Sequence, residues 1–303
     1  MLLPVILLAG VAEAQFGFGG GFGGLAHLRF GCSQLTIERL DPLVNPGQAP
    51  TPHMRQVIGG NALNASIPSE DISEIATCTT CGPADDFFNY WTANVYFRAR
   101  NGTYKRVPQI PNRFLFNDRF TTQTDGGVTV LLHLPRTWRS YRIPAWLPNG
   151  IRSNVLYPTC WDGKNLDSAN HIDHVAYPPS GPSNFLSTGD CPRSHPVKIP
   201  QLMLEIVWDT TAFNNPDEWP EDGSQPFVLS TGDKTGYGQH GDYVFGWKGD
   251  ALQRAMDDAG CFSAECGQQR SQDISVAKQC VIEKTVLEEV DGWLTELPGT
   301  PME

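Results

Sequence analysis

Positive charge and long apolar runs are both scarce in this chain of 303 residues. It has 22 Lys and Arg residues against 33 Asp and Glu residues, which gives a net charge of −11. The basic residues form no cluster, so the chain lacks the basic face with which proteins bind nucleic acid or an anionic membrane. No apolar run reaches the length of about 20 residues that spans a bilayer. We therefore expect neither nucleic acid nor a membrane as a partner.

Charged residues are few as well, at 18% of the sequence, whereas glycine and proline are abundant, with 30 and 24 residues. This composition favours short strands and long ordered loops over helices. The hydrophobic content of 40% is sufficient for a proper core. The length allows one large domain or two smaller ones.

The first residues have the features of a secretory signal peptide. In "LLPVILLAGVAEAQ", an apolar run of about eleven residues ends at Ala12-Glu13-Ala14, an A-x-A cleavage site. The sequence thus predicts a signal peptide over residues 1–14 and a secreted, extracellular protein. Residues 15–31 include "QFGFGGGFGG" and have the composition of a disordered Gly/Phe-rich linker.

Eight cysteines, an even number, favour disulfides in a secreted chain. The "CTTC" at 78–81 is also the spacing of a zinc or redox motif, but a single C-x-x-C is a weak signal for either. The connectivity stays open, except that we expect Cys160 to pair with Cys191, because both cysteines begin polar blocks that would then lie side by side. Two sequons, at Asn64 and Asn101, predict N-glycosylation.

The strand pattern is clearest between residues 89 and 107. Val95, Phe97 and Ala99 alternate with polar residues, and Asn101-Gly102 is typical of a hairpin turn. Further strands are expected over 35–39 and 201–208, and in "DGGVTVLLHL" and "YVFGW". Helical periodicity occurs only late, in "WKGDALQRAMDDAG" and "SVAKQCVIEKTVLEEVDGWL". We predict a mainly β fold over 32–262, an antiparallel, jelly-roll-like β-sandwich with long disulfide-stapled loops, and a short C-terminal helical tail over 263–303.

Histidine is the most informative polar residue, because five of the seven histidines lie in glycine- or proline-rich loops. Loop histidines beside Gly, Asp and Arg favour a functional site, although a hydrogen bond that pins the loop would explain each of them equally well. Unusual polar blocks far apart in a chain suggest that the blocks meet in the fold. We predict one shared cleft formed by His53, Asp162, Lys164, His174, His195, His240 and Asp242.

The stretch "GDKTGYGQHGDYVFGW" (232–247) contains five glycines. We predict a loop in which Gly236, Gly238 and Gly241 permit tight backbone geometry, so that His240 and Asp242 reach the cleft. A strand should follow, with Tyr243, Phe245 and Trp247 on one face and Asp242 on the other. The alternative is that Asp233 and Asp242 only accept backbone amides in turns.

Together these segments resemble the fungal secreted family known as domain of unknown function 1996. The resemblance rests on blocks that lie in order between Cys32 and Cys261: "LDPLVNPGQAPTPHMRQVIGGNALN", "CTTC" with "DDFFNYWTANVYF", "CWDGKNLDS…DHVAYP", "GDCPRSHPVKIPQLMLE" and "STGDKTGYGQHGDYVFGW". The chain departs from the family pattern at Arg55, where many members have a histidine, and at Leu63, where they have an aromatic residue. The resemblance implies no settled function.

A secreted fungal protein meets mainly polysaccharide, so the first hypothesis is a protein that binds or cleaves it, as a glycoside hydrolase or a polysaccharide lyase. Hydrolysis would use two carboxylates from among Asp86, Asp162, Asp167 and Asp242. Elimination from a uronic acid would use a histidine or tyrosine base and a cation such as Arg55 or Lys164. The candidate catalytic residues are His53, Asp162, Lys164, His240 and Asp242. The candidate substrate-binding residues are Arg55, Tyr90, Trp91, Trp161, Tyr237 and Trp247.

Two other hypotheses stay open. His171 and His174 are three residues apart, a spacing that would align two imidazoles on one helical turn and bind a divalent metal with Asp242 or Asp162 as third ligand. Otherwise no cofactor is expected. Alternatively, the chain is a non-catalytic, disulfide-stapled wall protein that binds glucan or chitin, in which Asp162 only bonds the backbone of its turn.

Overall fold

The computed structural model describes residues 26–118, 131–134, 150–181, 189–258, 261–263 and 266–299. The predicted signal peptide and most of the predicted linker lie outside these residues. The linker prediction is wrong at its C-terminal end, where strand β1 (Ala26–Cys32) forms. Leu28, Phe30 and Cys32 alternate along β1 and are buried in the core, so a strand pattern begins directly after the glycine-rich stretch.

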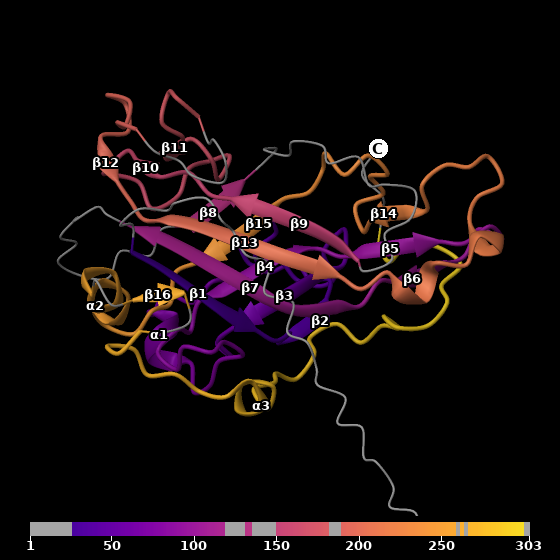
Figure 1. The fold of residues 1–303 in the computed structure, drawn as a ribbon, viewed down its shortest axis with the longest axis horizontal. Helices are drawn as coiled ribbons and strands as arrows, with labels where there is room; N and C mark the ends of the chain where they lie inside the picture. The colour runs from indigo at the N-terminus through magenta and orange to yellow at the C-terminus, as the bar shows by residue number, and fades with distance from the viewer. Residues whose placement is uncertain are drawn as a thin grey trace, which may run out of the picture.

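Two five-stranded sheets form the body of the molecule (Figure 1). The first has the order β16-β1-β7-β13-β9, with β7 at Gln109–Asp118, β9 at Ile151–Leu156, β13 at Gln201–Trp208 and β16 at Phe262–Ser263. The second has the order β2-β3-β4-β15-β8, with β2 at Thr36–Glu38, β3 at Arg55–Gly59, β4 at Asn89–Ala93, β15 at Gly241–Val244 and β8 at Leu131–Leu134. Among the described strands, β1 and β16 are the parallel pair and the others are antiparallel. The predicted antiparallel, mainly β fold is confirmed.

Two three-stranded sheets extend this body. The first has the order β14-β5-β6, with β5 at Val95–Arg98, β6 at Tyr104–Arg106 and β14 at Phe227–Leu229. The predicted hairpin is confirmed, because β5 and β6 pair across the turn at Asn101-Gly102. The second has the order β11-β10-β12, with β10 at Cys160–Trp161, β11 at Val175–Ala176 and β12 at Val197–Lys198. Figure 1 shows this small sheet at one end of the molecule, away from β3 and β4.

Helices are short. They are α1 (Ile72–Ile75), α2 (Ala251–Asp257), α3 (Ile274–Ala277) and the 3-10 turns η1 (Thr211–Phe213) and η2 (Pro216–Glu218). The helix predicted in "WKGDALQRAMDDAG" is confirmed as α2, which buries Leu252 and Ala255. None of the helices in the described ranges combines the length and apolar character needed to cross a membrane.

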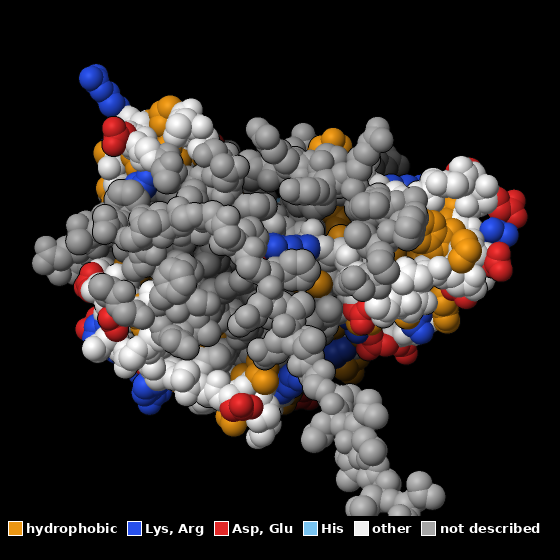
Figure 2. Space-filling view, viewed as in Figure 1, with side chains coloured by type: hydrophobic (Ala, Val, Ile, Leu, Met, Phe, Trp, Pro, Cys, Tyr) orange, Lys and Arg blue, Asp and Glu red, His pale blue; other side chains and the backbone are white. Residues whose placement is uncertain are grey.

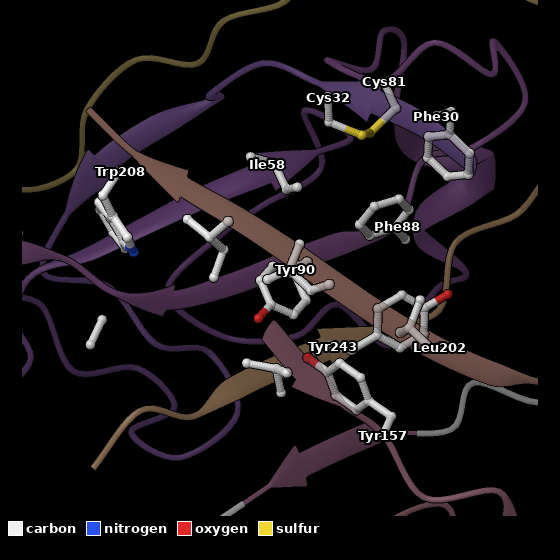
Figure 3. Packing of buried hydrophobic residues seen from close by; sticks show 14 of the residues in the cluster. Phe30, Cys32, Ile58, Cys81, Phe88, Tyr90, Tyr157, Leu202, Trp208 and Tyr243 are labelled. Carbon is white, nitrogen blue, oxygen red and sulfur yellow. A yellow bond between two sulfur atoms is a disulfide. The ribbon is translucent and has the colours of Figure 1, made fainter. Parts of the chain in front are cut away.

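The core lies between the two five-stranded sheets. Leu202 and Leu204 of β13 belong to the same buried cluster as Ile58 of β3, Tyr90 of β4 and Tyr243 of β15. Figure 3 shows the rings of Tyr90, Tyr243 and neighbouring Tyr157 gathered in this cluster. Two sheets that share one apolar core form the layered arrangement expected of a β-sandwich.

The second sheet is also covered on its other face, and this determines where the candidate site lies. Since strand side chains alternate, Val57, Trp91 and Val244 point away from the tyrosine-rich core and pack in a second cluster with Leu35, Leu43, Ile72 and Cys280. Asp242 shares this face because it pairs directly with Trp91. Polar residues on this face are therefore buried beneath the loop that joins β2 to β3.

The predicted C-terminal helical tail is wrong beyond α3. Residues 278–299 contain no helix; they run in an irregular, largely extended path along the molecule. The backbone amides of Thr285 and Val286 are hydrogen-bonded to the buried carboxylate of Glu38, at 2.9 and 3.0 Å. These hydrogen bonds compete with the backbone hydrogen bonds of a helix. Most of the apolar residues at helical spacing remain exposed to solvent, and Leu287 is 87% exposed.

Four disulfides join the eight cysteines: Cys32–Cys81, Cys78–Cys280, Cys160–Cys191 and Cys261–Cys266. The Cys160–Cys191 pair is the one expected from the sequence, and it closes the loop that carries His171 and His174. This use of cysteine is typical of extracellular proteins.

Candidate functional site

Two histidines that are 187 positions apart, His53 and His240, face each other beside the second sheet. Their ring centroids are 5.5 Å apart and their planes are nearly perpendicular, at 84°. His53 lies two residues before β3 and His240 one residue before β15. The two meet because β4 pairs with both strands, at Arg55–Ala93 and at Gly241–Thr92.

Hydrogen bonds orient both imidazoles through Nδ1. His240 Nδ1 lies 2.8 Å from the carbonyl oxygen of Gly238, which can only accept, so Nδ1 carries the proton. His53 Nδ1 lies 3.3 Å from the carbonyl of Met54 and 3.1 Å from Ser230 Oγ. The Ser230 hydroxyl donates to the Met54 carbonyl, so it accepts from His53. In both neutral rings, the lone pair is therefore on Nε2.

The two histidines differ in burial. His53 is only 3% exposed, and His240 is half-buried at the surface. Burial, the positive charge of Arg55 and the electrostatic effect of His240 lower the pKa of His53 to about 2. His53 is consequently a neutral imidazole at physiological pH, too weakly basic to take up a proton.

A buried cluster of charges lies next to His53. The Arg55 guanidinium forms a salt bridge with Asp41 at 2.5 Å and donates to Thr51 Oγ1 at 2.8 Å. Asp242 is near enough to stabilise the charge of Arg55 and, together with burial, to raise the pKa of Asp41. Asp41, Arg55 and Asp242 are each at most 3% exposed. The charge of one guanidinium thus interacts with two carboxylates in a region closed to solvent.

The fixed position of Asp41 comes from its own turn. Its Oδ1 accepts the backbone amides of Leu43 and Val44, at 3.2 and 2.9 Å, which leaves Oδ2 for Arg55. Sequence analysis missed Asp41. The available signal was its place at the start of the "DPLVNPGQAP" block, where Asp-Pro is a common way to begin a turn.

Gly241 separates His240 from Asp242 because only glycine fits there. A Cβ at this position would overlap the hydroxyl of Tyr90 and lie 3.0 Å from that of Tyr157. In Figure 3 these hydroxyls point toward each other, and the two rings are 6.0 Å apart. The tyrosines of the core thus require a glycine between the two polar residues.

The rest of the 232–247 stretch is a loop built around Asp233. Its Oδ1 accepts the amide of Thr235 at 2.7 Å and its Oδ2 accepts that of Gly238 at 2.6 Å. Asp233 therefore has the structural role that was the alternative for both aspartates. Asp242 lies on the opposite face of β15 from Tyr243, as predicted.

Some buried polar atoms that make no hydrogen bond within the described residues belong to the strands beside His53. Asn94 is fully buried, and its side-chain oxygen and nitrogen make no hydrogen bond to the described part of the chain. Its backbone contacts Met54 and Ser230, the two residues that hold His53. Arg55 Nε and Trp91 Nε1 are in the same condition. Such atoms are costly in a folded protein and are typical of places where a ligand or water binds.

The predicted cleft of seven residues does not form as one site. His53, His240 and Asp242 come together at the second sheet, but Asp162, Lys164, His174 and His195 lie in and around the small β11-β10-β12 sheet at the end of the molecule (Figure 1). There the Asp162 amide donates to the His174 carbonyl, and His195 Nε2 lies 2.9 Å from the Asp173 carbonyl. Local turn bonds and the Cys160–Cys191 disulfide hold this sheet as a unit of its own.

Asp162 and the His171–His174 pair have structural roles in that sheet. Asp162 Oδ1 accepts the amides of Lys164 and Asn165, the turn bonding proposed for a non-catalytic protein. The loop is not helical, and His171 has a φ of 58°, so the two imidazoles do not align on a helical turn. His171 bonds to Asp167 and His174 to Ser168.

The predicted metal triad of His171, His174 and Asp242 is likewise not assembled. Among the described residues, the three potential ligands that lie within 4.8 Å of one another are Asp258, Cys261 and Cys266. The two cysteines of that group are already joined in a disulfide.

Most of the aromatic residues expected to stack on sugar belong to the core. Tyr90, Trp91 and Trp247 are at most 1% exposed, so they offer no surface to a ligand. Trp161 is partly buried, and its Nε1 donates to the Asn165 carbonyl at 2.6 Å. Tyr237 is 55% exposed, on the loop that carries His240. Within the predicted set it therefore combines an accessible ring with a place on the His240 loop.

The predicted carboxylates do not form a hydrolytic pair. Asp86 is fully buried, and burial raises its pKa well above the usual range. Asp162 and Asp167 belong to the loops of the small sheet. The carboxylate that interacts electrostatically with Asp242 is instead that of Asp41, and the charge of Arg55 stabilises both.

These features define a disulfide-stapled, antiparallel β protein with a histidine pair at the edge of a buried Asp–Arg–Asp cluster. The family model described as "Domain of unknown function (DUF1996)" matches residues 41–138 and 134–247, and the chain belongs to this family. The match begins at Asp41 and ends at Trp247, so all five residues of the site lie within it. No curated protein and no solved structure matches the chain.

Proposed function

We propose that this is a secreted fungal protein that binds and cleaves extracellular polysaccharide at the His53–His240 site. The observation that carries the proposal is the convergence of the two histidines, one accessible and one buried, from opposite ends of the family match. Both rings are held through Nδ1, which fixes their orientation and makes Nε2 the lone-pair atom of the accessible His240.

The extracellular setting is supported by several features. Four disulfides cross-link the chain, and the N-terminal residues match a signal peptide. Asn64 and Asn101, the sequon asparagines, are both exposed, as attachment of a glycan requires. Outside the cell, a fungal protein meets mainly polysaccharide, which is rich in hydroxyl groups.

A neutral polysaccharide fits the charges better than an acidic one. On the described part of the face in Figure 2, Lys and Arg side chains are scattered between acidic ones instead of forming a patch. Arg55, which we expected to neutralise a uronic acid carboxylate, is buried and bound to Asp41. Elimination from a uronic acid therefore lacks its cation at this site.

His240 is the group with access to a substrate. It is half-buried, it lies on the same loop as the exposed Tyr237, and its Nε2 can accept a proton from a sugar hydroxyl or a water molecule. His53 lies beneath it as a neutral imidazole. Tyr237 would supply the stacking surface, because aromatic rings offer an apolar face and a polar edge.

The second candidate is a polysaccharide-binding protein without catalytic activity. It is favoured by the burial of Asp41 and Asp242, which removes the carboxylate pair that most glycoside hydrolases use. In that case Tyr237 would carry the binding and the charge cluster would only stabilise the loop.

A polysaccharide panel with matched variants tests both candidates. The purified protein would be incubated with glucans, chitin, mannan, xylan and pectate, and new reducing ends, unsaturated products and pull-down would be measured. We expect His240→Ala to lower turnover at least about 100-fold and Tyr237→Ala to weaken binding about tenfold, or about 1.4 kcal/mol. His195→Ala, in the other histidine loop, should change neither.

Pull-down without products would select the non-catalytic candidate. The absence of both binding and products across the panel would contradict the proposal, and so would an equal loss of turnover in His195→Ala and His240→Ala.

A further inference from the structure

We propose that a small pocket beside the His240 loop receives the acetamido group of an N-acetylhexosamine, so that the polysaccharide bound there is of the chitin class. The inference rests on the proposed function and names its substrate. The pocket lies between residues of β5, β9, β13 and β14 and the loop residues Asp233, Lys234, Gly236 and Gln239. The exposed position of Lys234 shows that the pocket opens to solvent.

The pocket is apolar and small. Apolar residues form most of its wall: Val95, Ile151, Trp208, Phe227, Val228 and Leu229. Its cavity volume is about 40 Å³. About 10–15 Å³ of such space holds one water-sized group, so the pocket takes about three of them. That is too little for a six-membered ring, but it fits a methyl group together with the carbonyl that carries it.

Gln239 brings a hydrogen-bond acceptor to the pocket. It is 5% exposed, and its Nε2 donates to Thr92 Oγ1 at 2.9 Å. The Thr92 hydroxyl donates to the His240 carbonyl, so it accepts from Gln239, which fixes the orientation of the Gln239 amide. The side-chain oxygen of Gln239 makes no hydrogen bond within the described residues. A buried acceptor of this kind is costly unless a donor such as an amide N–H binds it.

Ser153 brings the complementary donor. It also lines the pocket and is 4% exposed. Its Oγ accepts the indole N–H of Trp208 at 3.2 Å, and the hydroxyl hydrogen has no acceptor among the described residues. Since a hydroxyl can donate one hydrogen bond while it accepts others, Ser153 can donate to the carbonyl oxygen of a ligand.

An acetamido group has the three features that the pocket matches. Its methyl group is apolar, its N–H is a donor and its carbonyl oxygen is an acceptor. A sugar hydroxyl in the same place would leave the apolar wall unfilled and would gain less from burial. The charged residue that lines the pocket beside Lys234 does not compete for the ligand, because the Asp233 carboxylate already accepts amides of its own loop.

The loop connects the pocket to the proposed site. Gly236 and Gln239 line the pocket, the exposed Tyr237 lies between them in the chain, and His240 directly follows Gln239. One short loop thus offers an aromatic ring for stacking, a pocket for a substituent of the sugar and a histidine. A chain of N-acetylated sugars would use all three.

The test compares chitohexaose with cellohexaose, which has the same β-1,4-linked backbone but a hydroxyl in place of each acetamido group. Binding of each to the purified, full-length secreted chain would be measured by calorimetry. We expect chitohexaose to bind at least about tenfold more tightly, because the acetamido group buries a methyl group and completes two hydrogen bonds. Val95→Leu, which adds one carbon at the wall, should abolish this preference, and Ser153→Ala should reduce it.

The matched control is Val155→Leu, the same substitution at a buried position of β9 outside the pocket lining. It should keep the preference for chitohexaose, and thermal melts would verify that all variants fold. Equal affinity for the two hexaoses, no binding of chitohexaose, or a preference that persists in folded Val95→Leu would overturn the inference.

Two outcomes separate this inference from the proposed function. Cleavage of another polysaccharide without any preference for chitohexaose would overturn the inference alone. Saturation-transfer NMR with free N-acetylglucosamine addresses the reverse case. Transfer to the acetyl methyl group that Val95→Leu abolishes, in a chain that neither binds nor cleaves any polymer, would support the acetamido pocket and contradict the proposed function.

Discussion

Replacement of Arg55 by methionine should lower the free energy of unfolding by about 3–5 kcal/mol, the usual cost of removing one partner of a buried ion pair. Asp41 and Asp242 would remain in a region closed to solvent without the positive charge that interacts with both. Methionine keeps much of the volume and flexibility of the arginine stem, so the loss would come from charge more than from packing. Equilibrium unfolding in denaturant at pH 7 measures the effect.

Two further variants make the Arg55→Met result specific. Arg254→Met removes an exposed ion pair with Asp250 on α2 and should cost less than about 1 kcal/mol. Arg55→Met combined with Asp41→Asn should recover part of the loss, because one of the two buried charges is then gone while Oδ1 still accepts its amides. A double variant no more stable than Arg55→Met would mean that the carboxylates do not depend on Arg55 as proposed.

Removal of the Cys78–Cys280 disulfide should be the other large change. The bridge joins residues 202 positions apart, and in the chain-entropy model a loop of that length contributes about 5 kcal/mol. It also ties the extended C-terminal segment to the body, next to the second apolar cluster. Cys78→Ala with Cys280→Ala should therefore lower stability by about 4–5 kcal/mol in denaturant unfolding and expose residues 281–299 to protease.

The matched control for this bridge is the pair Cys261→Ala and Cys266→Ala. These cysteines are five positions apart, so the same model gives only about 2 kcal/mol for their loop. Equal losses in the two double variants, or proteolysis of residues 281–299 at the wild-type rate, would show that the long bridge does not hold the C-terminal segment.

Local signals in the sequence were sufficient to predict most strands. They failed where long-range contacts determine the conformation of a segment. The hairpin at Asn101-Gly102 and the strand over 201–208 follow from turn chemistry and apolar runs. The segment after α3 has helical periodicity, but a disulfide at Cys280 and the Glu38 carboxylate hold it extended. Neither partner is near in sequence, so periodicity could not reveal them.

The candidate site was predictable only in part, because local patterns identify some of its residues but not which strands pair. The Gly241 break marked His240 and Asp242, and the density of loop histidines marked His53. Their separation from Asp162, Lys164, His174 and His195 depends on which strands pair, which no local pattern encodes. Tyr90, Trp91 and Trp247 look like ligand-binding aromatics beside polar loops, yet all three are buried, and both faces of the sheet that contains Tyr90 and Trp91 are covered.

The geometry of the histidine pair is tested most directly by long-range ¹H–¹⁵N NMR of the metal-free protein, together with nuclear Overhauser effects between histidine rings. The structure predicts a cross-peak between the rings of His53 and His240, with the proton on Nδ1 in both neutral rings. Because burial and Arg55 lower the pKa of His53 to about 2, its ring should still be neutral at pH 5. Absence of the cross-peak in a folded sample, or a protonated His53 at pH 5, would contradict the site.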